Sequence, residues 1–304
     1  MRFVKKNIRY QISDVRFLIL KGEPYFYLLP TIIGLLLFSA GSVVATFFIS
    51  FTRWPIVTSP HWIGLGNYRA ILQSHLFWQV FWNTLYFAAL AVPLSVGAAL
   101  AAAVLVHRQV RGIRFFRTVY FLPVVSSMVA VALVWSYMFN PEYGILNYLL
   151  KLIGIRGPAW LYDAHWAIPA MVLVTVWKGL GYSMVIFLAG LQSIPEELYE
   201  AAALDGAGSS RRFWRITLPM LSPTLFFVLV ITLINSFQVF EQTYVLTRGG
   251  PANATLTLSY HIYENAFQFF QMGYAAAESY VLFAFVFAIT LVQFKLQHRW
   301  VFYG

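Results

Sequence analysis

The chain contains no cysteine and few charged residues. Only 11% of its 304 residues are charged, and 11 acidic residues stand against 21 Lys and Arg. The missing cysteine excludes disulfide frameworks, thiol catalysis, zinc knuckles and iron–sulfur clusters. Soluble domains are about 25% charged, and a soluble globule of this length cannot bury a 60% hydrophobic composition. The composition therefore argues against a soluble enzyme, a structural protein or a nucleic-acid binder, and predicts a membrane protein whose net charge of +10 reflects the positive-inside rule.

Six long apolar runs dominate the sequence. A helix needs about 20 mostly apolar residues to cross the hydrocarbon core of a membrane. Small residues crowd the second run from Gly97 to Ala103, which favours close packing between helices. We predict six transmembrane helices, at roughly Tyr25–Phe51, Trp78–Val106, Val119–Phe139, Trp166–Leu191, Pro219–Leu246 and Ala275–Leu296.

Lys and Arg are concentrated in alternate connections. They precede the first run and occur again in the connections after the second and fourth runs and in the tail, while the other connections hold only five. Because positively charged residues are retained on the cytoplasmic side, this bias predicts that both termini are cytoplasmic.

Residues 1–22 carry a separate pattern. Five apolar residues recur there at helical spacing, with basic residues between them: Val4, Ile8, Ile12, Val15 and Leu18. The pattern predicts an amphipathic helix on the inner membrane surface, with a disordered basic tail as the alternative. The apolar run that follows is too long for a cleaved signal peptide. We therefore interpret residues 23–304 as a six-span domain.

The connection between the fourth and fifth runs, about 193–219, has the clearest local signals. Ser193 and Glu196 have the spacing of a capping box, which predicts a helix beginning there. We expect this helix to end near Gly206 or two residues later, because glycine closes helices. Its exposed small residues would let a groove on another protein approach the backbone, and Glu200 would add an acidic contact.

One motif in this connection resembles that of a known family. Glu200-Ala201-Ala202 is followed after three residues by Gly206, and after nine more by Ile216-x-Leu218-Pro219. The arrangement is similar to the EAA motif of binding-protein-dependent ABC importer permeases. Further segments resemble the carbohydrate branch, with its maltose-, glycerol-phosphate- and multiple-sugar-type systems: Phe121-Leu-Pro123, Leu188-Ala-Gly-Leu-Gln192 and Gly249-Gly-Pro-Ala-Asn-Ala-Thr255. The resemblance extends from Pro24 onward, without the extra N-terminal spans and the large periplasmic insertion of the maltose permease.

This resemblance implies an all-α membrane protein with the type I ABC importer permease fold, six transmembrane helices and a cytoplasmic coupling helix. The chain would be the permease subunit of an ATP-driven sugar or oligosaccharide importer in the prokaryotic plasma (inner) membrane. Its partners would be a homologous second permease, a cytoplasmic ATPase homodimer and an extracytoplasmic solute-binding protein. ATP and Mg would be bound by the ATPase, since this chain has no Gly-rich phosphate loop. The chain itself would then hold no cofactor and would not be an enzyme.

The resemblance also implies how the subunit would be coupled. The helix around Glu200 would sit in a cleft of the ATPase, with Glu200 paired to a basic residue there and Gly206 supplying the turn. Closure of the ATPase dimer would then rock the two permeases between inward- and outward-facing states. The implied coupling residues are Glu200, Ala201, Ala202, Asp205, Gly206, Ile216, Leu218 and Pro219.

Polar residues within two spans indicate a translocation pathway. Ionisable residues inside spans usually face a cavity or a partner, and Lys178 lies midway along the fourth span. Asn235, Gln238, Glu241 and Gln242 would share one face of a continuous fifth helix. The resemblance places the family's sugar contacts at Trp177, Gly179, Tyr182, Asn235 and Gln238. Interhelical packing is the alternative for each polar residue. The predicted pathway set is Trp177, Lys178, Gly179, Tyr182, Asn235, Gln238 and Glu241.

The remaining ionisable residues carry separate expectations. Lys178 either pairs with Glu241 across the bundle or faces an anionic sugar. Glu278, near the outer end of the sixth span, is expected at the membrane interface. The six histidines show no paired-ligand spacing, which argues against a metal site.

The competing class is a self-sufficient secondary carrier or channel for a polar solute. That class needs no docking helix, and its coupling ions usually require buried acidic residues. The intact docking motif and the few acidic residues within the spans favour the importer.

Overall fold

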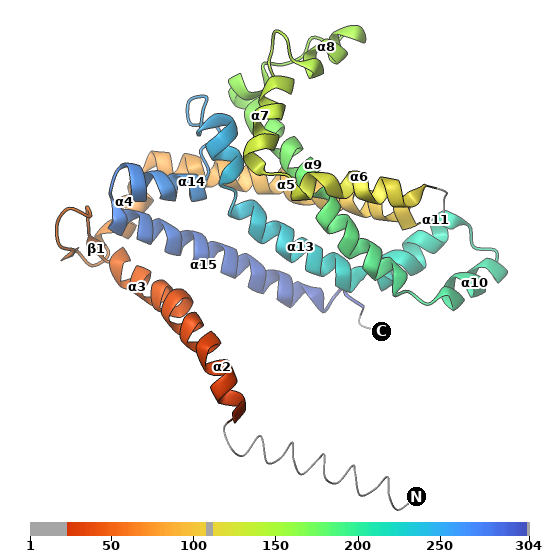
Figure 1. The fold of residues 1–304 in the computed structure, drawn as a ribbon, viewed down its shortest axis with the longest axis horizontal. Helices are drawn as coiled ribbons and strands as arrows, with labels where there is room; N and C mark the ends of the chain where they lie inside the picture. The colour runs from red at the N-terminus through yellow and green to blue at the C-terminus, as the bar shows by residue number, and fades with distance from the viewer. Residues whose placement is uncertain (1–22, 108–111, 303–304) are drawn as a thin grey trace, which may run out of the picture.

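The chain folds almost entirely into helices, in a computed structural model that describes residues 23–107 and 112–302 (Figure 1). The predicted amphipathic segment at 1–22 lies outside these residues. The elements in chain order, with short 3₁₀ or π segments labelled η, are α2 (Glu23–Gly34), η1 (Leu35–Ala40), α3 (Gly41–Ser50), β1 (Thr52–Arg53), β2 (His61–Trp62), α4 (Gly66–Gln73), α5 (His75–His107), α6 (Ile113–Val125), α7 (Met128–Met138), α8 (Ile145–Leu152), η2 (Trp160–Tyr162), α9 (Ala164–Gln192), α10 (Glu196–Leu204), α11 (Ser209–Arg212), η3 (Phe213–Thr217), α12 (Leu218–Met220), α13 (Ser222–Phe237), η4 (Thr243–Thr247), α14 (Leu258–Tyr263), η5 (Glu264–Gln268) and α15 (Met272–Gln297).

Within residues 23–107 and 112–302, four continuous helices are long and apolar enough to cross a membrane. They are Tyr27–Ser50, His75–His107, Ala164–Gln192 and Met272–Gln297, and each matches a predicted span to within a few residues. These four predictions are confirmed.

The other two predicted spans are broken. Phe115–Val125 and Met128–Met138 meet at an angle of 102°, and Ser209–Met220 and Ser222–Phe237 meet at 66°. The described residues thus contain six candidate spans if each bent pair counts as one. The prediction of a continuous helix was wrong for the third span and also for the fifth, because helix α13 ends at Phe237.

Helix α9 packs against α5, α6 and α13, and α15 packs against α3, α4, α13 and α14. Small residues on α5 make its contact with α9 possible: Ala99 and Ala103 are fully buried, in one cluster with Met184 and Phe187 of α9. The small-residue run of the second span therefore serves helix packing, as predicted. In Figure 1, α5, α6, α13 and α15 run alongside one another, α7 and α8 project to one side, and α10 lies at the end far from β1.

Two short strands form a turn beside the start of the last helix. Thr52 pairs with Trp62 in an antiparallel bridge, and the Met272 amide donates to the Trp54 carbonyl at 3.0 Å. Gly273 lies so close to the Thr52 carbonyl that a Cβ atom would collide with it. The connection after α3 is thereby fixed against the first turn of α15.

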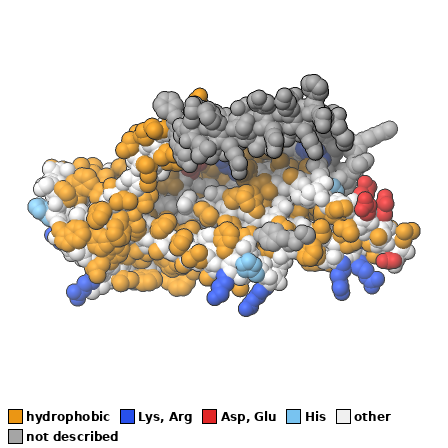
Figure 2. Space-filling model, turned by 90° about the horizontal axis from the view of Figure 1, so that it is seen from below, with side chains coloured by type: hydrophobic (Ala, Val, Ile, Leu, Met, Phe, Trp, Pro, Cys, Tyr) orange, Lys and Arg blue, Asp and Glu red, His pale blue; other side chains and the backbone are white. Residues whose placement is uncertain are grey.

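Much of the surface is apolar, as expected for a chain surrounded by lipid. Large hydrophobic side chains such as Phe38, Val125 and Tyr137 are more than two-thirds exposed. Figure 2 shows hydrophobic side chains covering most of the face in view, with basic groups at its edges. The hydrophobic effect in water does not explain such a surface, whereas solvation by lipid does.

Candidate functional site

Helix α10 is the predicted docking helix, and it is exposed along most of its length. It runs from Glu196 to Leu204, and Glu196 and Glu197 occupy its first turn, where the helix dipole favours acidic side chains. The capping box was a wrong prediction. Pro195 is the N-cap residue, and Ser193 Oγ instead donates to the Gly190 carbonyl at 2.8 Å, at the end of α9.

Gly206 closes helix α10 in a Schellman motif. The Gly206 amide donates to the Ala203 carbonyl at 3.1 Å, and the Ala207 amide donates to the Ala202 carbonyl at 2.8 Å. Gly206 has a φ of +72°, a left-handed conformation that costs other residues about 1–2 kcal/mol. The helix therefore ends where the sequence predicted, with a backbone geometry that suits glycine.

Helix α10 is tied to the segment that leads into the fifth span. The hydroxyl of Tyr199 is 3.0 Å from that of Thr217 in η3. A cavity of about 600 Å³ lies between α10, the end of α5 and η3, with Glu196 and Arg212 in its lining. The contact links α10 to the segment that continues into α12 and α13.

Charges of both signs surround the docking helix. Glu197 and Glu200 are exposed, and Figure 2 shows the acidic side chains in view gathered at the end of the molecule where α10 lies. Asp205 lines a second cavity, of about 570 Å³, together with Arg211, Arg212 and Arg215.

The other predicted coupling residues differ in exposure. Ala201 and Pro219 are exposed, whereas Ala202, Ile216 and Leu218 are half-buried. The motif thus divides into exposed residues and half-buried ones, of which Ala202 and Ile216 line the same cavity as Asp205.

On helix α9, the predicted pathway residues are accessible. The exposed fraction is 41% for Trp177 and 50% for Tyr182, and Gly179 is exposed as well. The ring of Trp177 also packs edge-on against Trp135 of α7, with centroids 5.6 Å apart.

Lys178 does not pair with Glu241 in the described structure. Its Nζ donates to the carbonyl of Ser126 at 3.0 Å and to that of Val124 at 3.5 Å. Both carbonyls lie at the break between α6 and α7. The ion pair, which was one of the two interpretations of Lys178, is therefore replaced by a contact between a cation and the end of a helix.

The polar stripe of the fifth span is not on one helix. Helix α13 ends at Phe237, and Gln238 is its C-cap, so the expectation of a shared helical face was wrong. Asn235, Gln238 and Glu241 are nevertheless all exposed, and Gln242 is half-buried. They surround the break instead of following a continuous helix.

Hydroxyl groups of the following connection donate hydrogen bonds to the free carbonyls at this second break. Thr257 Oγ1 donates to the Val239 carbonyl at 3.0 Å, and Ser259 Oγ donates to that of Phe237 at 3.4 Å. Thr257 Oγ1 is also 3.1 Å from Thr243 Oγ1 in η4. A sequence pattern does not reveal these contacts, because they join segments on either side of a turn.

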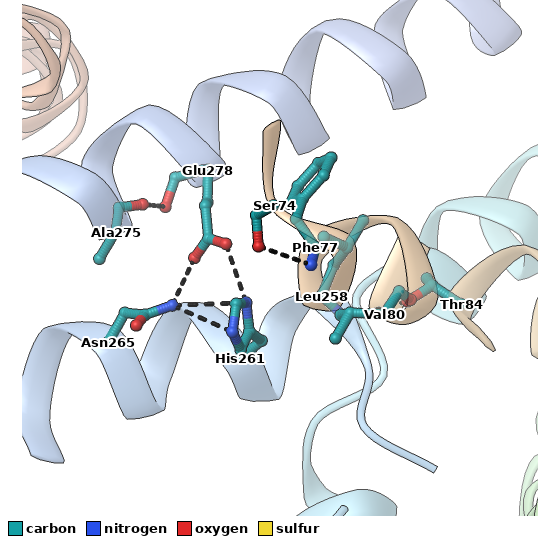
Figure 3. Close-up of polar contacts among 10 residues, drawn as sticks. Ser74, Phe77, Val80, Thr84, Leu258, His261, Asn265, Ala275 and Glu278 are labelled. Atoms are coloured by element: carbon teal, nitrogen blue, oxygen red, sulfur yellow. Dashed lines mark hydrogen bonds and ion pairs between the residues drawn. The ribbon is translucent and has the colours of Figure 1, made fainter. Parts of the chain in front are cut away.

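A buried polar cluster joins α14 and η5 to α15, and sequence reasoning missed it (Figure 3). Glu278 is fully buried inside the chain, and its predicted depth near the membrane interface stays a prediction. Its Oε1 lies 2.8 Å from His261 Nδ1, and Asn265 Nδ2 donates to its Oε2 at 2.9 Å. His261 and Asn265 are four residues apart, a spacing that could have suggested a shared helical face.

Glu264 lies beside this cluster, outside the spans. Burial raises its pKa, although its hydrogen bond to Tyr260 and the nearby His261 act in the opposite direction. Burial, together with the negative charge of Glu264, raises the pKa of Tyr260. Among the described residues, no group of three metal-ligating side chains forms a candidate metal site.

Comparison with known proteins identifies the family. Residues 91–301 match the model of the "binding-protein-dependent transport system inner membrane component" family. A probable ABC transporter permease of Bacillus subtilis, YesP, is 39% identical over 92% of this chain and 91% of its own length. The sn-glycerol-3-phosphate transport system permease UgpA of Agrobacterium fabrum is 38% identical over 81% of this chain and 84% of its own length.

Solved structures agree with this result. A chain of a bacterial ABC transporter involved in the import of the acidic polysaccharide alginate matches with a TM-score of 0.82 and 26% identity, over 95% of this chain and 99% of that one. A second structure of a bacterial alginate transporter, in complex with an alginate pentasaccharide-bound periplasmic protein, matches with the same TM-score and identity.

The chain therefore belongs to the family of binding-protein-dependent transport system inner membrane components. It is a multi-pass membrane permease with the type I ABC importer permease fold, and the fold and family implied by the EAA motif are confirmed.

Proposed function

We propose that this chain is the permease subunit of an ATP-driven importer of sugars or oligosaccharides, in which it forms half of the translocation pathway. A homologous second permease supplies the other half. The observation that carries the proposal is α10, an exposed acidic helix closed by Gly206 and hydrogen-bonded through Tyr199 to the segment that leads into the fifth span. A helix of this kind offers a partner protein a docking point on the transmembrane bundle.

In the proposed complex, α10 docks into a cleft of a cytoplasmic ATPase homodimer. Glu200 pairs with a basic residue of the ATPase, and the small side chains of Ala201 and Ala202 allow close approach. ATP and Mg are bound by the ATPase, and this chain holds no cofactor. The basic residues of the connections support an orientation in which both termini and α10 are cytoplasmic.

The proposed substrate is a carbohydrate delivered by an extracytoplasmic binding protein. A permease for sulfoquinovosyl glycerol from Agrobacterium fabrum, 35% identical over 77% of this chain, and the two alginate transporter structures support this class. Trp177 and Tyr182 offer exposed aromatic rings, which stack on the apolar face of a sugar, and Asn235 and Gln238 offer amides for its hydroxyls. Lys178 is already engaged by two carbonyls, so the proposal does not require an anionic sugar.

Purification of the tagged chain from its host in mild detergent tests the proposal. We expect a second permease and an ATPase to co-purify in fixed ratio, with ATP hydrolysis that rises when a loaded binding protein is added. A chain that purifies alone, hydrolyses no ATP and still moves solute in vesicles would establish the secondary carrier instead.

A further inference from the structure

The break between α6 and α7 exposes carbonyl groups within a span, and each needs a partner because lipid offers none. Ser126 satisfies two of them: its Oγ donates to the Leu122 carbonyl at 3.2 Å, and its amide donates to the Pro123 carbonyl at 3.3 Å. The Nζ of Lys178 donates to the carbonyls of Val124 and Ser126. Lys178 lies 52 positions after Ser126 in the chain.

Helix α9 is shaped to bring Lys178 to this point. Gly181 lies one turn further along, directly against the backbone of α6: a Cβ atom there would collide with the Tyr120 carbonyl and lie 2.8 Å from Phe121 Cα. On the other side of the break, Trp177 packs against Trp135 of α7. On α9, Gly181 therefore contacts α6, Lys178 contacts the break, and Trp177 contacts α7.

Helix α7, beyond the break, also contacts the segment that follows α13. Helix α7 packs against η4, and partly buried Val245 and Leu246 join the cluster that contains Val131 and Trp135. A change in the angle between α6 and α7 would therefore move η4 too, and Gln238 and Glu241 lie in the short stretch between α13 and η4.

We propose that Lys178 is a positioning residue for transport, whose ammonium group holds the angle between α6 and α7. A cation at the C-terminal end of a helix is favoured by the helix dipole as well as by the carbonyls it satisfies. When Lys178 is present, α7 and η4 are held in one arrangement. Without it, the carbonyls of Val124 and Ser126 lose their donor, and α7 and η4 adopt other angles relative to α6.

The role of Lys178 at the helix break is independent of the substrate and of the ATPase. It is also a different role from binding an anionic sugar. The two roles predict different results for neutral and acidic substrates, and a purely structural role predicts loss of folded protein.

Distance measurement across the break tests the proposal in the assembled complex. The chain has no cysteine, so Val119→Cys on α6 and Val134→Cys on α7, both exposed, supply one spin-label pair within this subunit. The complex with the cysteine-free chain gives the background from the partner subunits. We expect Lys178→Met to broaden or shift the distance distribution, with a change in conformer ratio of about tenfold for one charged hydrogen-bond donor.

Two control variants make the result specific. Lys178→Arg keeps the charge and the donors and should preserve the wild-type distribution. Lys151→Met removes a positive charge from the exposed helix α8 and should also leave it unchanged. An unaltered distribution in Lys178→Met, in complexes that assemble normally, would overturn the proposal.

Transport assays with a neutral and an acidic oligosaccharide provide the second readout. If Lys178 positions the break, Lys178→Met lowers the maximal rate for whichever of these sugars the wild-type complex carries, without a selective rise in KM for the acidic one. A rise in KM for the acidic sugar alone would assign Lys178 to substrate binding and overturn the positioning role. Absence of ATP-driven transport by the wild-type complex would overturn the proposed function, while the distance measurement would still decide the role of Lys178.

Discussion

His261 Nδ1 lies 2.8 Å from Glu278 Oε1, in a site where Glu278 is fully buried. The pair joins α14, in the connection after the fifth span, to the first half of the last transmembrane helix. Because Asn265 donates to the second carboxylate oxygen, both oxygens of Glu278 have a contact (Figure 3). A buried charge without such contacts would be strongly unfavourable.

Removal of either partner should therefore destabilise the folded chain. We expect His261→Ala to lower the free energy of unfolding by about 3–5 kcal/mol, because the carboxylate remains buried without its partner. Glu278→Gln should cost less, since an amide keeps the shape and carries no charge. Thermal unfolding in detergent measures both, and a double variant His261→Ala/Glu278→Ala should cost less than the sum of the two alanine variants. Strict additivity would contradict the interaction.

ATP-driven uptake should be lost when the charge or the turn of the coupling loop is changed. Glu200→Lys reverses the charge of an exposed residue, and Gly206→Pro is incompatible with a φ of +72°. We expect both variants to insert in the membrane at normal levels and to lose most ATP-driven uptake. Glu200→Asp, which keeps the carboxylate, should retain uptake. Normal uptake by both Glu200→Lys and Gly206→Pro would exclude a coupling role for α10.

Substitution of Trp177 should lower the apparent affinity for substrate more than substitution of a neighbouring residue on α9. Trp177→Ala removes an exposed ring that we assign to sugar stacking, and a loss of about 1 kcal/mol corresponds to a roughly fivefold rise in KM. Leu173→Ala provides a matched control, because Leu173 is one turn away on the same helix and its exposed fraction of 43% is close to the 41% of Trp177. Equal effects of the two variants on transport would indicate that Trp177 serves packing.

The orientation can be tested directly because the chain lacks cysteine. Val57 is 90% exposed in the turn between β1 and β2, and Phe302 is 56% exposed in the tail. In intact cells, Val57→Cys should react with a membrane-impermeant maleimide, whereas Phe302→Cys should react only after permeabilisation. The opposite pattern would show that the positive residues were misinterpreted.

The four continuous spans were predictable because hydropathy depends on composition over a long window. The third and fifth spans were mispredicted because a break in a helix depends on contacts that composition does not record. At the break after Val125, Lys178 donates to carbonyls in addition to the local Ser126, and at the break after Phe237 the donors are Thr257 and Ser259. Lys178, Thr257 and Ser259 all lie in other segments of the chain than the carbonyls that they contact.

The coupling loop was the most predictable part of the candidate site. The turn at Gly206 depends on local backbone conformation, and local conformation can be inferred from the residue type. The capping box failed locally, because Ser193 closes α9 and does not open α10. The pair formed by His261 and Glu278 could not be predicted, since it requires α14 to fold back against α15.

Uptake by proteoliposomes tests the central claim most directly. Vesicles would contain this chain with its co-purified partners, and labelled oligosaccharide would be supplied with the binding protein outside and ATP inside. The proposed function predicts accumulation that requires both ATP and the binding protein and that Glu200→Lys abolishes. Uptake that proceeds without ATP, driven by a solute or ion gradient alone, would contradict it.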